Sequence, residues 1–229
     1  LMEAYEPIDY LACATSAMRE ADNSRKIISE IAKYSGLNLE VIDGKKEANI
    51  IFSTHIEEKL NPNMAYLYID VGGGSTELTL FHRNEPIEER SFNIGTIRML
   101  EGLVKKGQWQ DMKEWINKHT FQFSHISAIG SGGNINKIIK LAKHSDGRSI
   151  NLEKMKKVKA CMKKYSLDDR IALLGLKPDR ADVIVPALKI YASVMKWGGI
   201  KQIGVPQIGL ADGLVRMMYR QRQEGHVSQ

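Results

Sequence analysis

The sequence contains little cysteine and no long hydrophobic run. Only two of its 229 residues are cysteines, Cys13 and Cys161, and their spacing fits neither a disulfide scaffold nor a metal site. The six histidines are scattered, and none is spaced with a cysteine or a second histidine as metal ligands are. No apolar run approaches the length of a membrane-crossing helix. These absences argue against zinc-binding and membrane-spanning classes, and they predict a reducing, cytoplasmic setting without a membrane partner.

Two catalytic motifs are also missing from the chain. It contains neither the Walker A pattern G-x-x-x-x-G-K-[ST] nor the nucleophile elbow G-x-S-x-G. P-loop chemistry and covalent serine catalysis are therefore poor candidates. The hydrophobic content of 43% and the charged content of 26% are ordinary for a globular protein. The net charge of +6 favours anionic partners such as polyphosphate, nucleotides or nucleic acid.

Segments with strand-like and helix-like patterns alternate along the chain, which predicts an α/β fold. The break at Asn61-Pro62-Asn63 and the rising strand content after it predict two lobes, over residues 1–63 and 64–229. A polar, frayed tail is expected over 221–229. Strands are expected over 11–15, 39–42, 78–81, 90–92, 125–129 and 200–205, and helices over 23–34, 45–52, 95–103, 108–119, 134–143, 152–165, 179–197 and 209–220.

The most informative stretch runs from Tyr68 to Leu78 and reads Y-I-D-V-G-G-G-S-T-E-L. A short apolar strand delivers Asp70 to three consecutive glycines. Glycines allow positive φ and can turn several N–H groups toward one point, where they attract an anion. A carboxylate at the strand end can hold Mg²⁺, mostly through water, and the metal then bridges to phosphates. An ordinary glycine-rich hairpin has the same pattern, but a phosphate-binding hairpin is favoured.

A lysine stripe lies on the helix expected over 152–165. Lys156, Lys159 and Lys163 share one side of this helix, opposite an apolar side. The stripe is either a track for a long polyanion or an ordinary solvated face, and the second interpretation is favoured.

The stretch around Asp70 resembles the second phosphate loop of the exopolyphosphatase and guanosine pentaphosphate phosphohydrolase (Ppx/GppA) family. That family belongs to the class of actin, hexokinase and heat-shock chaperones. The resemblance implies a two-lobed, ribonuclease H-like phosphotransfer fold. It extends over nearly the whole chain, because five further stretches match family motifs in order: A-T-S-A-M-R-E-A-D-N (14–23), G-K-K-E-A (44–48), I-G-S-G-G-N (129–134), R-A-D-V-I-V-P (180–186) and G-L-A-D-G-L (209–214).

Two departures from the family pattern matter. The family's first phosphate loop, a strand ending in D-I-G-S-N-S, is not found in the sequence, so we expect an incomplete first lobe and negligible activity of these residues alone. Lys46 stands where the family has the first of two glutamates. A cation there would depress the pKa of Glu47 and weaken it as a base. Consecutive helical residues face different directions, which limits this effect.

The resemblance also implies a reaction, namely metal-dependent hydrolysis of a terminal phosphoanhydride with Mg²⁺ or Mn²⁺ as cofactor. Asp70 and the first-loop aspartate would hold the metal, and Glu47 would orient the attacking water. Arg19 and Arg180 would grip the phosphate chain or nucleotide with paired donors. Without the resemblance, Glu47 and Arg19 would be surface residues, and Arg180 an ion-pair partner of a neighbouring aspartate. The remaining substrate-binding candidates are Gly72, Gly73, Gly74, Ser75 and Thr76 of the hairpin, and Gly132 and Gly133 of the later loop.

Inorganic polyphosphate and guanosine pentaphosphate both remain open as substrates, and no specific nucleic-acid partner is expected. A competing interpretation is a non-hydrolytic phosphate- or nucleotide-binding module that keeps the same fold. Lys46 and the absence of the first phosphate loop from the sequence motivate it. Homodimerisation is a further expectation, because family members often dimerise.

Overall fold

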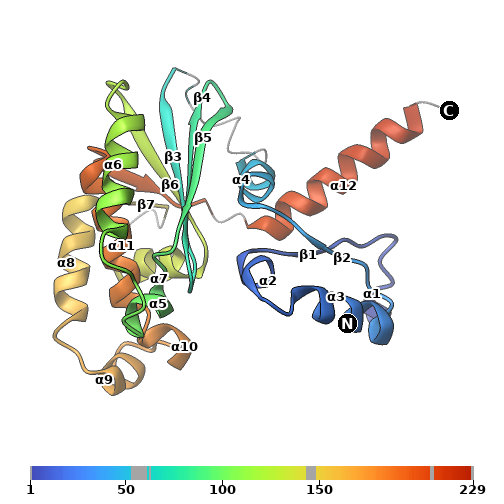
Figure 1. The fold of residues 1–229 in the computed structure, drawn as a ribbon, viewed down its shortest axis with the longest axis horizontal. Coiled ribbons are helices and arrows are strands. Elements are labelled where there is room, and N and C mark those ends of the chain that lie inside the picture. The colour runs from blue at the N-terminus through green and yellow to red at the C-terminus, as the bar shows by residue number, and fades with distance from the viewer. Residues whose placement is uncertain (1, 53–60, 62, 143–147, 207–208, 228–229) are drawn as a thin grey trace.

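Two β-sheets organise the molecule. The computed structural model describes residues 2–52, 61, 63–142, 148–206 and 209–227. Its strands are β1 (Ala12–Ala14), β2 (Leu39–Val41), β3 (Ala65–Val71), β4 (Thr76–His82), β5 (Glu85–Phe92), β6 (Ile126–Ser131), β7 (Ser149–Asn151) and β8 (Gln202–Gly204). The strands β1 and β2 form a small parallel sheet, and the other six form one sheet in the order β5-β4-β3-β6-β8-β7 (Figure 1). In the large sheet β3 is antiparallel to β4 and parallel to β6.

Helices alternate with these strands, as the sequence pattern predicts. Local signals set several boundaries. Gly36, with φ of 71°, ends the third helix, and its N–H donates to Ala32. Ser166 and Asp169 form a capping box at the start of the ninth helix. Within the described residues no helix is both long and apolar enough to cross a membrane. The helices are α1 (Met2–Tyr5), α2 (Ser16–Glu20), α3 (Ser24–Ser35), α4 (Gly44–Phe52), α5 (Thr96–Leu100), α6 (Gln108–Thr120), α7 (Gly133–Ala142), α8 (Leu152–Met162), α9 (Leu167–Ala172), α10 (Pro178–Ala181), α11 (Ile184–Trp197) and α12 (Leu210–Val227).

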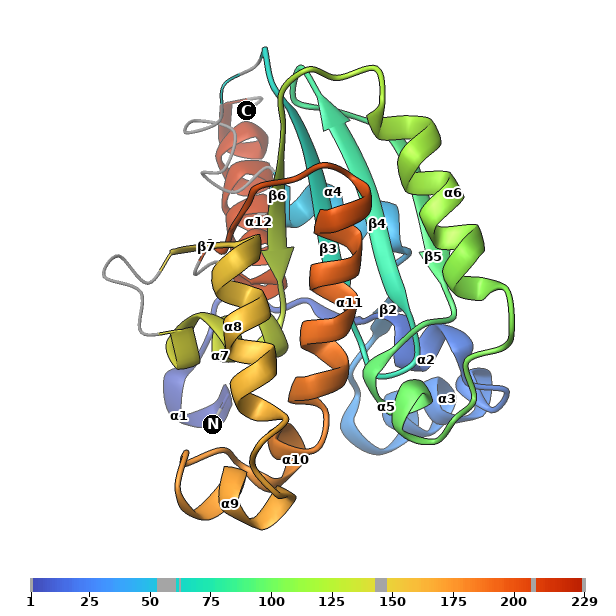
Figure 2. The same ribbon diagram turned by 90° about the vertical axis from the view of Figure 1, so that its left-hand side faces the viewer.

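The large sheet is buried on both faces around β3. Leu67 and Ile69 point into the main core, which also contains side chains of α6, α8 and α11. Figure 2 shows these helices in front of the sheet and α4 and α12 behind it. Tyr66 and Tyr68 point to that second face and form a smaller cluster. Because alternate strand residues face opposite sides, Asp70 shares the face of the two tyrosines.

The last helix packs against α4. Ile42, Ile50 and Leu214 form a buried cluster there, and Leu210 contacts both this cluster and that of the tyrosines. Gly213 permits the close approach, because a Cβ on it would lie 2.5 Å from Ile50 Cγ2. The helix α12 therefore connects α4 to the large sheet (Figure 1). The lobe boundary at 61–63 stays a prediction, and residue 62 lies outside the described residues.

The structure corrects several predicted elements. The strand expected over 90–92 begins at Glu85, and the helices expected over 95–103 and 152–165 end at Leu100 and Met162. The helix expected over 179–197 is two helices, α10 and α11, and Pro186 lies in the first turn of α11, where its missing N–H costs nothing. The tail expected over 221–229 is wrong for 221–227, which continue α12. The edge strand β7 is absent from the prediction, and residue 143 of the helix expected over 134–143 lies outside the described residues.

Candidate active site

Two carboxylates face each other at the end of the central hairpin. Asp70 on β3 lies directly opposite Glu77 on β4 in the antiparallel register. Burial, and next the negative charge of Glu77, raise the pKa of Asp70 to about 6. The N–H of Val71 opposes this shift. Like charges placed opposite each other on a sheet are unfavourable in themselves, so a cation at this position would stabilise the pair.

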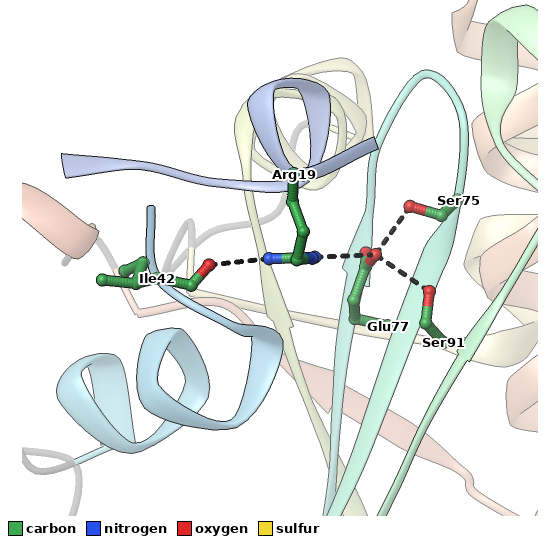
Figure 3. Close-up of polar contacts among 5 residues, drawn as sticks. All are labelled: Arg19, Ile42, Ser75, Glu77 and Ser91. Atoms are coloured by element: carbon green, nitrogen blue, oxygen red, sulfur yellow. Dashed lines mark hydrogen bonds and ion pairs between the residues drawn. The ribbon is translucent and has the colours of Figure 1, made fainter. Parts of the chain in front are cut away.

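Glu77 is the centre of a polar network that sequence reasoning did not assign (Figure 3). Its Oε1 accepts hydrogen bonds from the hydroxyls of Ser75 at 2.6 Å and Ser91 at 3.2 Å. Arg19 on α2 places Nη2 3.9 Å from the same oxygen and donates from Nη1 to the Ile42 carbonyl at 2.7 Å. Arg19 thus links the small sheet to the large one. The hairpin symmetry about Gly73-Gly74, which pairs residue 70 with residue 77, is the signal that could have identified Glu77.

Glu47 lies in the first turn of α4 and is electrostatically coupled to both carboxylates. Burial, and then the charges of Asp70 and Glu77, raise the pKa of Glu47 to about 7, while Arg19 lowers it. The structure therefore brings Glu47, Asp70 and Arg19 together around Glu77. A carboxyl group with a pKa near neutrality can accept a proton under physiological conditions.

Lys46 is not among the groups that shift the pKa of Glu47, which answers the question that the sequence left open. The Lys46 ammonium lies 2.5 Å from Glu40 Oε1, so it is turned toward β2. The charges that act on Glu47 come from Asp70, Glu77 and Arg19. The different directions of consecutive helical side chains explain the outcome.

The glycine loop presents three consecutive N–H groups that have no partner among the described residues. The N–H of Gly72 donates to the Ser75 carbonyl at 3.0 Å. The N–H groups of Gly73, Gly74 and Ser75 have no hydrogen-bond acceptor within the part of the chain that the structure describes. Such a run of free donors beside a strand end is a feature of anion-binding loops.

The helix α5 holds the other side of this loop. Thr96 and Ile97 donate from their backbone to the carbonyls of Gly72 and Gly73 at 3.0 and 2.9 Å, and Arg98 Nε donates to the Gly74 carbonyl at 2.8 Å. None of the three loop glycines has a positive φ, so the expectation of left-handed backbone there is wrong. A small residue is instead required at Gly73, where a Cβ would lie 2.9 Å from Ile97 Cδ1, and at Gly95, where a Cβ would lie 2.2 Å from the Gly73 carbonyl oxygen.

The hydroxyl groups of the hairpin are already engaged within the protein. Thr76, a substrate-binding candidate from the sequence, is fully buried, and its hydroxyl donates to the Ile94 carbonyl at 2.5 Å. Ser75 is also buried, and its hydroxyl donates a hydrogen bond to Glu77 Oε1. The backbone of the loop, rather than its hydroxyls, therefore remains open to an anion.

The later glycine loop borders Asp70 from the β6 side. Gly132 has φ of 91°, and a Cβ on it would lie 3.1 Å from Asp70 Oδ1. A Cβ on Gly133 would lie 2.9 Å from the Arg180 guanidinium. Asn134 donates to the Val71 carbonyl at 3.3 Å and accepts from Arg180 at 3.4 Å. The loop thereby places the Arg180 clamp candidate next to the strand that carries Asp70.

Arg180 also forms the alternative ion pair considered from the sequence, with Nε 3.5 Å from Asp179 Oδ2. Both side chains are well exposed, and such pairs contribute little to stability.

A hollow of about 280 Å³ lies between the start of α4 and strands β4 and β5. Arg19 and Glu77 line it.

Comparison with known proteins identifies the family. The model of the Ppx/GppA phosphatase family matches residues 1–221. The chain belongs to this family. Guanosine-5'-triphosphate,3'-diphosphate pyrophosphatase of Aliivibrio fischeri is 25% identical over 94% of the chain and 46% of its own length. Exopolyphosphatase 1 of Mycobacterium leprae is 22% identical over 90% of the chain and 67% of its own length.

A solved structure supports the same fold. The exopolyphosphatase from Cytophaga hutchinsonii superposes with a TM-score of 0.77 at 23% identity, over 95% of this chain and 77% of that one. The predicted α/β fold is confirmed, and it is the fold of this exopolyphosphatase. The chain spans about half the length of the first curated relative that it matches.

Proposed function

We propose that the protein containing these residues hydrolyses the terminal phosphoanhydride bond of inorganic polyphosphate or guanosine pentaphosphate. The observation that carries this proposal is the row of three free N–H groups at Gly73, Gly74 and Ser75, beside the Asp70 and Glu77 carboxylates. Donors of this kind stabilise charge that develops on phosphoryl oxygens, and they do so without reorganising.

The chain's own residues divide the tasks of such a reaction. The loop N–H groups bind the terminal phosphate, and the guanidinium groups of Arg19 and Arg180 hold neighbouring phosphates from the two sides of Asp70. Glu47, with a pKa of about 7, accepts a proton from the attacking water. The Arg19–Glu77 contact keeps α2 and the small sheet close to the hairpin.

Asp70 and Glu77 fit a divalent cation. Within the described residues no group of three or more His, Cys, Asp or Glu side chains could hold a metal ion alone. Mg²⁺ typically uses one or two carboxylates and completes its shell with water and substrate phosphates, and Mn²⁺ accepts similar ligands. The pKa of Asp70, raised first by burial and next by the charge of Glu77, supports this assignment. When bound, the cation would neutralise charge on the phosphoryl oxygens.

The alternative of a non-hydrolytic binding module loses one of its two motives, since Lys46 does not act on Glu47. The relatives' names include both a guanosine pentaphosphate pyrophosphatase and an exopolyphosphatase, so both substrates stay in the proposal. A cytoplasmic setting and homodimerisation remain predictions.

Phosphate release by the full-length protein tests the proposal, with polyphosphate and guanosine pentaphosphate assayed side by side, with Mg²⁺ or Mn²⁺ and with chelator. Metal-dependent release from either substrate is expected, and the ratio of the two kcat/KM values identifies the preferred one. A folded protein that binds both substrates and releases no phosphate would establish the binding module instead.

A further inference from the structure

A basic hollow lies on the helix-covered face of the large sheet, away from α2 and α4. Its volume is about 470 Å³. Lys159 and Lys163 from the end of α8, Arg170 of α9 and Lys189 of α11 contribute four cationic groups. The opposite wall is apolar, and the only carboxylate that lines the hollow within the described residues is Asp182. None of its lining residues belongs to the candidate active site.

The three lysines of this hollow have no ion-pair partner among the described residues. Among the described residues Asp182 forms no ion pair with these lysines, and its Oδ1 accepts the N–H of Val183 at 2.7 Å. Lys189 lies over the Trp109 ring, with Nζ 4.8 Å from the ring centre. Burial, and next the charges of Lys163 and Lys189, lower the pKa of Lys159. Within the described residues the four cations therefore face a single carboxylate, and the lysines repel one another.

Arg170 is fixed in place by the backbone. Its Nε donates to the Met162 carbonyl at 3.1 Å, and its Nη1 donates to the Ala181 carbonyl at 3.0 Å. The guanidinium therefore ties α9 to the end of α8 and forms a rigid floor for the hollow. A held guanidinium loses little entropy when it binds an anion.

The three lysines of the stripe predicted on α8 have two different surroundings. Lys156 pairs with Glu153 at 2.7 Å and belongs to an ordinary solvated face. Lys159 and Lys163 instead turn into the hollow, where cations from two other helices join them. Convergence of cations from three helices on one concavity distinguishes this part of the stripe from a solvated helix face.

We propose that this hollow is an accessory binding site for a compact polyanion carrying several phosphates, either a condensed inorganic phosphate or the polyphosphate group of a nucleotide. Four clustered cations match several adjacent negative charges, and Lys and Arg are the side chains that bind phosphates. The volume exceeds what a single phosphate needs, and a concave site of this size suits a small molecule. The site stands independently of whether the chain hydrolyses phosphoanhydrides.

Calorimetric titration of inorganic tripolyphosphate into the 229-residue chain tests this site, with chelator present so that turnover cannot intervene. The double variant Lys159→Gln/Lys163→Gln removes two cations of the hollow. The matched control Lys157→Gln/Lys164→Gln removes the same charge from the same segment at two exposed positions outside the hollow. We expect one binding event to weaken roughly tenfold or more in the first variant and less than about twofold in the second.

Trp109 fluorescence provides a local readout, because an anion that engages Lys189 alters the cation over that ring. We expect tripolyphosphate to change this signal in the wild type and in the control, but not in Lys159→Gln/Lys163→Gln. GTP is titrated in parallel. Equal affinities assign the site to condensed phosphate, and tighter GTP binding assigns it to a nucleotide. Equal losses in both double variants, or no loss in either, would overturn the proposal.

Discussion

Burial, and next charge at close range, govern the acidic residues of the candidate active site. Glu47, Asp70 and Glu77 all carry acidic groups, and Arg19 is the cation that acts on Glu47. The result is one carboxyl group whose pKa lies near neutrality and a second whose pKa is about 6. Environments that shift pKa values in this way are frequent in catalytic sites.

The pH dependence of phosphate release should report Glu47. A general base works in its ionised form, and its pKa is raised to about 7, so kcat/KM should rise with pH up to about 7 and then level off. The change Arg19→Met removes the cation that lowers this pKa, so the rising limb should move to higher pH by about one unit. Full pH–rate profiles of both proteins measure the shift independently of the height of the curves. A limb that stays in place, or one centred near 4.5, would contradict the assignment.

At the scale of single residues, the sequence predicted which residues belong to the site better than it predicted where their side chains point. The motif placed Asp70, Glu47, Arg19 and Arg180 in one site because their order along the chain matches a known pattern. It could not show that Lys46 turns to Glu40 or that the Thr76 hydroxyl is buried against Ile94. Those outcomes depend on helix phase and on strand register. Glu77 was readable from the hairpin symmetry alone.

At the level of elements, the glycine loop is a hairpin held by a helix. The first N–H groups of α5 satisfy the carbonyls of Gly72 and Gly73, so the first turn of α5 finds its acceptors in the loop. With its carbonyls tied down, the loop has its N–H groups left for an anion. The sequence predicted the hairpin and a helix after it. It could not predict their contact, because Gly95 and Gly73 are brought together only by the tertiary fold.

The change Gly95→Ala should damage this arrangement. Gly95 has extended backbone, with φ of −124°, so any residue could adopt it. A Cβ there would nevertheless lie 2.2 Å from the Gly73 carbonyl oxygen. We expect the unfolding free energy to fall by roughly 1–3 kcal/mol and phosphate release to fall with it. Gly204→Ala is the control, since its Cβ would meet only the Ala128 oxygen at 3.8 Å. Equal stability of both variants in urea unfolding would refute this account of the loop.

Across the whole molecule, α12 positions the helix that carries Glu47. It packs on α4 through Gly213 and Leu214, and through Leu210 it also reaches the tyrosine face of the large sheet. The sequence predicted the last helix. That Ile50 is the residue against which Gly213 packs follows only from the three-dimensional arrangement.

The change Gly213→Ala separates local from tertiary effects. Helix propensity alone favours alanine over glycine by about 1 kcal/mol. The new Cβ would lie 2.5 Å from Ile50 Cγ2 and 2.7 Å from its carbonyl oxygen, so crowding should outweigh this gain and lower stability by roughly 1–2 kcal/mol. The exposed control Ala211→Gly should lose about 1 kcal/mol through propensity alone and keep full activity. Increased stability of Gly213→Ala in denaturant titration would show that α12 does not hold α4 in this way.

The most direct test of the account compares Glu47→Gln with Lys46→Gln in the full-length protein. Both variants change one charged residue on neighbouring positions of α4. Glu47→Gln should lower kcat for phosphate release by about 10²–10⁴-fold while substrate affinity changes little, because only the base is lost. Lys46→Gln should retain kcat within about twofold, since its ammonium faces Glu40. Undiminished turnover in Glu47→Gln would contradict the central claim that this carboxylate activates the attacking water.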